Sequence, residues 1–352
     1  MSHPLQALLV RNPTVDEALR LARIVAVSAD TPFVIQTLGQ LLRSTLSVKT
    51  THFELVDRLV VVHHAAPTQG SEPASLEALQ DTDMVLVGMY GIESSKSQGT
   101  FVGRPTAGRS EAETNAAVRV ALAAVKGELP DDADPENGFI MYHGCPTPIL
   151  DFVKAEMPLQ WEDRMYDMFI AHSPSSKLGL RIGSSWVDGE TGETFVIDRI
   201  RRSDFEAILA ALENYTNGYL EIITQTYPFT ELNCMIRAYP KGVDPTTASH
   251  EQGEPAAWAS THLDFSCGAL ATRDKYRRRK LAAKCVEVVT ALQLELLEKH
   301  FGSLLADCSM KPLCFGMVHD ANIPSIRTME GCGFRKAEGV RFQWIGIKLS
   351  SI

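Results

Sequence analysis

The spacing of apolar residues in the last third of the chain predicts a strand, a turn and a long helix in succession. A short run of small and apolar residues at 268–272 is typical of a buried strand. After a polar turn at 273–280, apolar residues recur from Leu281 with the spacing of one helix face, and Gly302 is expected to end this helix. The apolar helix positions are Leu281, Cys285, Val288, Val289, Leu292 and Leu296.

The turn is strongly basic, with six positive side chains and one acid, Asp274. The first backbone N–H groups of a helix have no partner within the helix, so a basic turn at this point predicts an anion site. We expect its ligand to be a pyrophosphate. A basic cluster such as 275–280 is also typical of a solvated turn or an import signal.

The sequence after the long helix favours the anion site. A second strand is expected at 312–319, and a short helix follows Asn322. Gly333 and Phe334 then precede a last strand at 340–349. This order of elements resembles the GNAT superfamily of acyl-CoA-dependent N-acyltransferases, and most closely its glycine N-acyltransferase-like branch.

Two short motifs carry the resemblance. The family's pyrophosphate motif, Arg/Gln-x-x-Gly-x-Gly/Ala, corresponds to 277–282, which reads RRRKLA. The family also has an asparagine after the next strand and Gly-Phe eleven and twelve residues later, which Asn322, Gly333 and Phe334 match. Lys280 replaces the central glycine of the first motif, and we expect the backbone to approach a phosphate less closely there.

The resemblance implies acyl-CoA or acetyl-CoA as co-substrate, with no permanently bound cofactor and no metal. Backbone groups of Leu270 and Thr272 would bind the pantetheine arm from one side, and Asn322 with Ser325 from the other. Asn322 would serve equally well as a helix N-cap. The phosphates would be bound by the motif residues Arg277, Arg278, Arg279, Lys280, Leu281 and Ala282.

The catalytic residues implied by the resemblance depart from the family pattern. Ser266 stands where the family often has a glutamate base. Asp264, expected on the same strand face, would act as base with Ser266 as relay, and His262 is an alternative; Asp264 could instead only form a turn. The family's tyrosine, which protonates the leaving thiolate, corresponds to Met329, so His319 is the candidate acid.

The first half of the chain predicts an α/β layer without a chemical motif of its own. The resemblance implies a GNAT-like domain without the CoA motif. The stretch 173–192 is rich in Ser, Gly and charged residues, which is typical of a linker. We therefore expect the domain boundary there, with domains at 1–185 and 186–352. We expect an α/β fold with a mixed sheet, and the resemblance implies that the second domain has the GNAT fold and binds acyl-CoA. The helices and strands predicted over 194–352 follow the order of elements in the GNAT fold, and none of them is left over.

The remaining elements are predicted from periodicity and from Gly and Pro positions. The expected helices are 14–27, 32–46, 114–127, 148–157, 205–215 and 219–227. The expected strands are 59–62, 84–89, 139–142, 194–200, 234–239, 255–263 and 266–272. The expected loops are 67–74 and 94–110. His63 and His64 are neighbours on a strand and face opposite sides, so they are not expected to share a metal.

Composition limits the partners. The net charge of −9 argues against general attraction to nucleic acid or to an anionic membrane. The seven cysteines are odd in number and form no CxxC pair, which favours a reducing compartment. No apolar run reaches the roughly 18 residues of a membrane span. We therefore expect an intracellular protein, cytoplasmic or mitochondrial, that binds neither nucleic acid nor membrane.

Three functions remain open from the sequence. The first is an N-acyltransferase that moves an acyl group from acyl-CoA to a small amine, such as glycine or another amino acid. The second is a GNAT acetyltransferase that acts on protein or peptide amines. The third is a non-catalytic CoA-binding protein, which the residues Ser266 and Met329 suggest.

Overall fold

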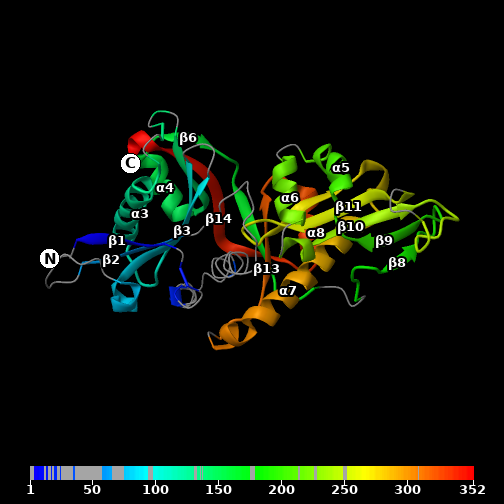
Figure 1. Ribbon diagram of the computed structural model, residues 1–352, viewed down its shortest axis with the longest axis horizontal. Coiled ribbons are helices and arrows are strands. Elements are labelled where there is room, and N and C mark those ends of the chain that lie inside the picture. The colour runs from blue at the N-terminus through cyan, green and yellow to red at the C-terminus, as the bar shows by residue number, and fades with distance from the viewer. Residues whose placement is uncertain are drawn as a thin grey trace. The chain divides into compact units, whose positions relative to one another are not determined.

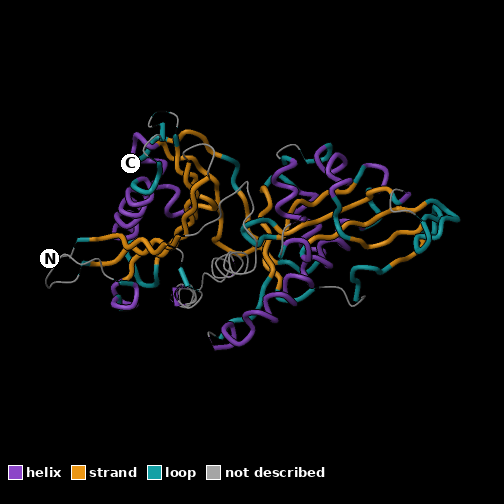
Figure 2. Tube along the Cα trace, in the orientation of Figure 1, coloured by secondary structure: helices purple, strands orange, loops and turns teal. Residues whose placement is uncertain are grey.

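The computed structural model has a mixed α/β architecture, as predicted (Figures 1 and 2). Its contacts divide the chain into two compact units. Unit 1 comprises Met1–Thr45, Lys49–Asp167 and Glu338–Ile352, and unit 2 comprises Leu46–Val48 and Met168–Ala337. The described residues are 4–11, 13–14, 17, 20–21, 24, 35, 58–65, 75–93, 98–130, 133–134, 136, 138–174, 179–212, 215–225, 228–248, 252–307 and 309–352.

The helices predicted at 14–27 and 32–46 lie outside the described residues, apart from isolated positions, and so does the loop predicted at 67–74. Within the part of the chain that is described, no helix is both long enough and apolar enough to cross a membrane.

Unit 1 contains one sheet with the strand order β1-β2-β3-β4-β5-β14, and β6 also pairs with β14. The pair β4–β5 is parallel, and the other pairs described within this unit are antiparallel. The strands are β1 (Leu5–Arg11), β2 (Arg58–His64), β3 (Met84–Glu93), β4 (Gln98–Pro105), β5 (Phe139–Pro146), β6 (Leu159–Glu162) and β14 (Arg335–Lys348). The helices are α3 (Glu111–Lys126) and α4 (Thr147–Glu156), with short 3-10 turns at Leu76–Ala78, Asp81–Asp83 and Leu349–Ser351.

The loop predicted over 94–110 was wrong, because Gln98–Pro105 forms β4. Its glycines suggested a loop, but they let aromatic rings lie against the strand. A Cβ atom on Gly99 would lie 2.4 Å from the ring of Tyr90, and one on Gly103 would lie 2.4 Å from the ring of Phe101. These glycines are therefore required by packing within a sheet.

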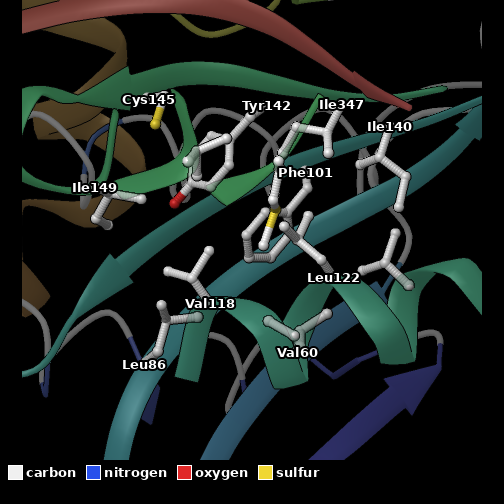
Figure 3. Packing of buried hydrophobic residues seen from close by; sticks show 14 of the residues in the cluster. Val60, Leu86, Phe101, Val118, Leu122, Ile140, Tyr142, Cys145, Ile149 and Ile347 are labelled. Atoms are coloured by element: carbon white, nitrogen blue, oxygen red, sulfur yellow. The ribbon is translucent and has the colours of Figure 1, made fainter. Parts of the chain in front are cut away.

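The core of unit 1 lies between the sheet and helices α3 and α4. Phe101 and Tyr142 pack edge to face with ring centroids 5.0 Å apart, and the hydroxyl of Tyr142 donates to the carbonyl of Gly103 at 2.7 Å. Figure 3 shows Val118 and Leu122 of α3 beneath these rings. The same cluster contains Ile347, which comes from the last strand of the chain.

The last strand was predicted to complete the C-terminal domain, and the structure corrects this. In β14, Ile345 pairs with Tyr142 of β5 and with Glu162 of β6, so 338–352 belongs to unit 1. Conversely, β7 (Tyr166–Ala171) pairs with β13 (Cys314–His319), and its residues from Met168 onward belong to unit 2. The units therefore divide at Asp167, whereas the predicted boundary lies at 185/186.

Unit 2 contains an antiparallel sheet with the strand order β12-β11-β10-β9-β8. The strands are β8 (Ser185–Val187), β9 (Thr194–Asp198), β10 (Asn233–Tyr239), β11 (Glu254–Thr261) and β12 (Cys267–Thr272). The helices are α5 (Phe205–Leu209), α6 (Asn217–Gln225), α7 (Leu281–Asp307) and α8 (Ile323–Gly331), with 3-10 turns at Arg202–Asp204, Phe229–Glu231 and Asp274–Tyr276. Helices α5 and α6 lie on one face of the sheet and α7 on the other (Figure 1).

Two predicted helix ends were wrong. The long helix does not end at Gly302 but continues to Asp307, because Leu304 and Leu305 are buried. Their burial outweighs the cost of about 1 kcal/mol for a glycine inside a helix. The helix predicted to reach Tyr215 ends at Leu209 instead.

A buried ion-pair network fixes the start of α5 to the sheet. Arg237 of β10 is 3% exposed and donates to Asp204 at 2.6 and 2.9 Å and to Asp198 at 3.0 Å. Burial alone would lower the pKa of Arg237, but these carboxylates raise it. Asp204 is also buried, so removing Arg237 would leave its carboxylate without this cation in the core.

The position of Ile347 leads to a prediction about stability. Replacing Ile347 by Ala removes apolar contacts from the core of unit 1 and should lower its free energy of unfolding by about 2–5 kcal/mol. Hydrogen exchange should accelerate in α3 while the amides of α7 in unit 2 remain protected. Ser350→Ala, an exposed change three residues away, is the control and should have little effect. Unchanged exchange in α3 of the Ile347→Ala variant would contradict the assignment of β14 to unit 1.

Candidate functional site

The edge strand β12 and the neighbouring strand β13 form one side of the candidate site. A Cβ atom on Gly316 of β13 would lie 3.1 Å from the carbonyl oxygen of Cys267, so the two strands approach closely at this point. Strand β12 nevertheless pairs only with β11 among the described strands. Its outer edge therefore has backbone groups that an extended ligand could bind.

A β-bulge interrupts β12 at its centre. The pairing with β11 shifts between Trp258 and Ser260, and Ala269 has a φ of +47°. Gly268 pairs with Ser260 and Ala271 with Trp258, so two residues of β12 oppose one of β11. Such a bulge turns backbone groups out of the regular ladder.

The turn between β12 and α7 has the backbone of an anion site. Arg277 has a φ of −60°, whereas Arg278 and Lys280 have φ values of +66° and +58°. Turns with such left-handed residues can form concavities of backbone N–H groups that bind anions. Lys280 thus adopts the conformation that the family's glycine would favour, although a left-handed backbone costs a side-chain-bearing residue about 1–2 kcal/mol.

Only part of the basic charge in this turn is free for a ligand. The guanidinium of Arg279 donates to Glu193 at 2.9 Å and lies 3.4 Å from Asp188, and the bond to Glu193 raises its pKa. Among the described residues, the exposed side chains of Arg278 and Lys280 form no ion pair or hydrogen bond. They are the two cations best placed to meet an anion.

The remaining cations of the turn are held by acids of the same unit. Arg273 and Lys275 both form salt bridges with Glu254, and Arg277 pairs with Asp274 at 2.8 Å. Burial would raise the pKa of Glu254, but its hydrogen bonds and the neighbouring charge of Arg273 lower it.

The start of α7 differs from the start of α3 in unit 1. Helix α7 has no acidic residue in its first turn. Helix α3 has Glu111 and Glu113 there, and the side chain of Ser110 accepts a hydrogen bond from the backbone N–H of Glu113 at 3.2 Å. A capped, acidic helix start repels anions, so only α7 offers a site of this kind among these two helices.

Two of the residues predicted for the pantetheine arm lie on the edge strand β12, and the other two lie at the start of α8. Leu270 and Thr272 both lie on β12, and the buried hydroxyl oxygen of Thr272 has no hydrogen-bond partner among the described residues. Asn322 caps α8 by accepting from the backbone N–H of Ser325 at 3.2 Å, so the N-cap interpretation is confirmed. Leu281 begins α7 and is buried, and Ala282 follows it.

Asp264 and Ser266 are in contact, but not on a strand face as predicted. Both belong to the turn between β11 and β12, where Asp264 accepts from the hydroxyl of Ser266 at 2.6 Å and from its backbone N–H at 3.0 Å. The carboxylate therefore organises the turn, in which Phe265 has a φ of +67°. This accords with the turn interpretation of Asp264.

His262 lies among polar groups that sequence reasoning did not bring together. Its Nε2 atom accepts from the backbone N–H of Ala269 at 3.1 Å and lies 3.2 Å from the hydroxyl of Tyr215. Its Nδ1 atom lies 2.7 Å from the hydroxyl of Tyr219. Burial lowers the pKa of His262, and the nearby charge of Asp264 opposes that effect. The four-residue spacing of the two tyrosines was the signal available in the sequence.

The remaining candidate residues lie on other elements of the chain. His319 ends β13 and pairs with Asp320 at 3.4 Å, and Met329, in the place of the family's tyrosine, packs against Gly316. In unit 1, His64 pairs with Glu113 at 2.7 Å. Within the described ranges, no three His, Cys, Asp or Glu side chains are grouped to hold a metal, and six cysteines are free and buried.

Comparison with known proteins supports the fold assignment. No protein-family model and no curated protein matches the sequence. A solved Drosophila protein matches with a TM-score of 0.57 and 12% identity, covering 98% of this chain and 99% of its own. A GCN5-related N-acetyltransferase from Sphaerobacter thermophilus matches with a TM-score of 0.51 and 12% identity, covering 97% and 96%.

A third solved structure, a tandem GNAT protein from the clavulanic acid biosynthesis pathway, matches with a TM-score of 0.50 and 10% identity, covering 98% of this chain and 99% of its own. At these identities the matches show the fold alone. The chain has the tandem GNAT fold, with two GNAT-like domains, and the GNAT fold predicted for the second half is confirmed.

The left-handed backbone of Lys280 predicts the effect of restoring a glycine. Lys280→Gly should raise the free energy of unfolding by up to about 1 kcal/mol, because relief of the left-handed conformation exceeds the entropy that glycine adds to the unfolded chain. Arg277→Gly is the control in the same turn. Its φ of −60° gives no strain to relieve, so this change should lower stability. Urea unfolding measures both, and a destabilised Lys280→Gly variant would contradict the turn geometry.

Proposed function

We propose that this protein is an acyl-CoA-dependent N-acyltransferase. One observation carries the proposal: the turn that starts α7 alternates left-handed and ordinary backbone, and its exposed Arg278 and Lys280 have no ion-pair partner among the described residues. This turn directly follows the edge strand β12. An extended ligand with a pyrophosphate at one end fits a strand edge followed by a helix start. The tandem GNAT fold agrees with this ligand.

Acyl-CoA would bind to unit 2 as a co-substrate. Backbone N–H groups of the turn and of Leu281 and Ala282 would bind the pyrophosphate, and Arg278 with Lys280 would supply charge. Backbone groups of Leu270 and Thr272 would pair with the pantetheine amides. Arg279, tied to Glu193, would shape the turn, and we assign it a smaller role in phosphate binding than the sequence suggested.

The reaction would be the transfer of the acyl group to an amine. The amine nitrogen attacks the thioester carbonyl carbon, the carbon–sulfur bond breaks, and CoA leaves as a thiolate that takes up a proton. The amine loses one proton in the same sequence of steps. His319, at the end of β13, is the proposed donor to the thiolate, because Met329 cannot donate.

The proposed acceptor is a small amine such as glycine or another amino acid. This choice rests on the resemblance of the motif region to the glycine N-acyltransferase-like branch. A protein or peptide amine is the alternative, and the GNAT fold agrees with either. Activity with free amino acids but not with peptides would favour the first.

CoA binding tests the anion site directly. A ligand at 100 times its dissociation constant adds about 2.7 kcal/mol to native stability, so CoA should raise the melting temperature. Dephospho-CoA should raise it less, because a charged group is lost. Arg278→Ala and Lys280→Ala should each reduce the shift.

The matched control is Arg202→Ala, which removes an exposed arginine of the same unit that pairs with Glu221. It should leave the shift unchanged. Release of free thiol from several acyl-CoAs in the presence of an amino-acid panel then tests catalysis. If millimolar CoA has no effect on melting, the proposal fails; if CoA binds but no acceptor releases thiol, the protein is a CoA-binding protein without this activity.

A further inference from the structure

Three partly exposed polar side chains converge at the bulge of β12. His262 follows β11, Tyr215 lies two residues before α6, and Tyr219 lies in its first turn. The ring centroids of both tyrosines lie 5.9 Å from that of His262. All three groups lie on the α5–α6 side of the sheet, where Ala269 of the bulge contributes to the core.

The hydrogen bonds at His262 determine its tautomer. A backbone N–H can only donate, so the Nε2 atom that accepts from Ala269 carries no proton. In the neutral ring the proton is then on Nδ1, where it is donated to the hydroxyl oxygen of Tyr219 at 2.7 Å. The hydroxyl of Tyr215, 3.2 Å from Nε2, is placed to donate to the same lone pair.

This arrangement keeps the Nε2 atom of His262 unprotonated at the bulge of β12. Gly268 makes it possible, because a Cβ atom there would lie 2.1 Å from Nε2 of His262. Protonation of Nε2 would break the bond to Ala269, which opposes the charged form in addition to the effect of burial. Asp264 is the charged group that acts on His262, and the two tyrosines are the titratable groups that face it.

We propose that His262 and Tyr215 together accept the proton that the amine loses during acyl transfer. The inference rests on the proposed N-acyltransferase function and names the proton acceptor of that reaction. The geometry favours this pair over Asp264, because the contact between the hydroxyl of Tyr215 and Nε2 gives the proton a path, whereas the hydrogen bonds that Asp264 accepts from Ser266 lie within the turn.

The proton transfer balances without any further reagent. As the amine nitrogen forms its bond to the carbonyl carbon, one N–H proton moves to the hydroxyl oxygen of Tyr215. The proton of that hydroxyl moves to Nε2 of His262. The imidazolium formed donates from Nδ1 to Tyr219 and from Nε2 to Tyr215, and it returns its extra proton to solvent after the product leaves.

The His262→Gln variant distinguishes a role of His262 as proton acceptor from a purely structural role. A glutamine amide can accept from the N–H of Ala269 and donate to Tyr219, but it cannot take up a proton near neutral pH. We expect turnover with glycine to fall about 10²–10⁴-fold, the usual worth of general-base assistance, with CoA affinity unchanged. Tyr215→Phe should lower turnover at least tenfold, and Tyr219→Phe, the matched control, should lower it less.

The pH profile supplies a second readout. In the wild type, kcat/KM should fall at low pH with a limb below 6.5, the ordinary pKa of histidine. This limb should disappear in His262→Gln, whose rate should then follow the ionisation of the acceptor. Glycinamide, a more acidic ammonium than glycine, should therefore be the better acceptor for this variant. Turnover and pH profile like those of the wild type would overturn the inference.

Nuclear magnetic resonance of the imidazole tests the arrangement without substrate. We expect the neutral ring with its proton on Nδ1 at pH 7, and its titration below 6.5. A ring protonated at Nε2 would overturn the inference. Failure of the proposed function is distinguishable: it would show as no effect of CoA on melting, whereas failure of this inference alone leaves CoA binding and acyl transfer intact in His262→Gln.

Discussion

The turn between β12 and α7 has to hold six positive side chains close together at the start of a helix, where the helix dipole also disfavours positive charge. Acids from the same unit relieve this repulsion. Glu254 pairs with two cations of the turn, and Glu193, just before β9, pairs with Arg279. Among the residues that the structure describes, Arg278 and Lys280 then have no ion-pair partner, and the proposed phosphate site is built on these two side chains.

The two units show how one fold can be used in two ways. Each has a strand followed by a turn and a helix on one side of its sheet, at β4–α3 and at β12–α7. In unit 1, Ser110 caps the start of α3, and two glutamates in the first turn supply negative charge there. The helix dipole of α3 thus interacts with side chains of its own unit. In unit 2 the start carries no acid, and the turn before it is left-handed at two residues. The capacity to bind an anion thus depends on a few residues before the helix.

The sequence predicted the helices, strands and caps that depend on short local patterns of residues. The strand, basic turn and helix around 277–282 and the cap at Asn322 follow from periodicity and side-chain type alone. The periodicity did not predict that 338–352 joins unit 1, because which sheet a strand enters depends on pairing with distant residues such as Tyr142. Nor did it predict the cluster at His262, since Tyr215 and Tyr219 are separated from it by more than forty residues and meet it only through the sheet.

We propose that a single helix start, that of α7, binds the pyrophosphate of an acyl-CoA. Isothermal titration calorimetry of the full chain with CoA tests it most directly. We expect one site per chain, with an affinity that falls as salt rises because charge contributes to binding. Two equivalent sites per chain, or an affinity independent of salt, would contradict it.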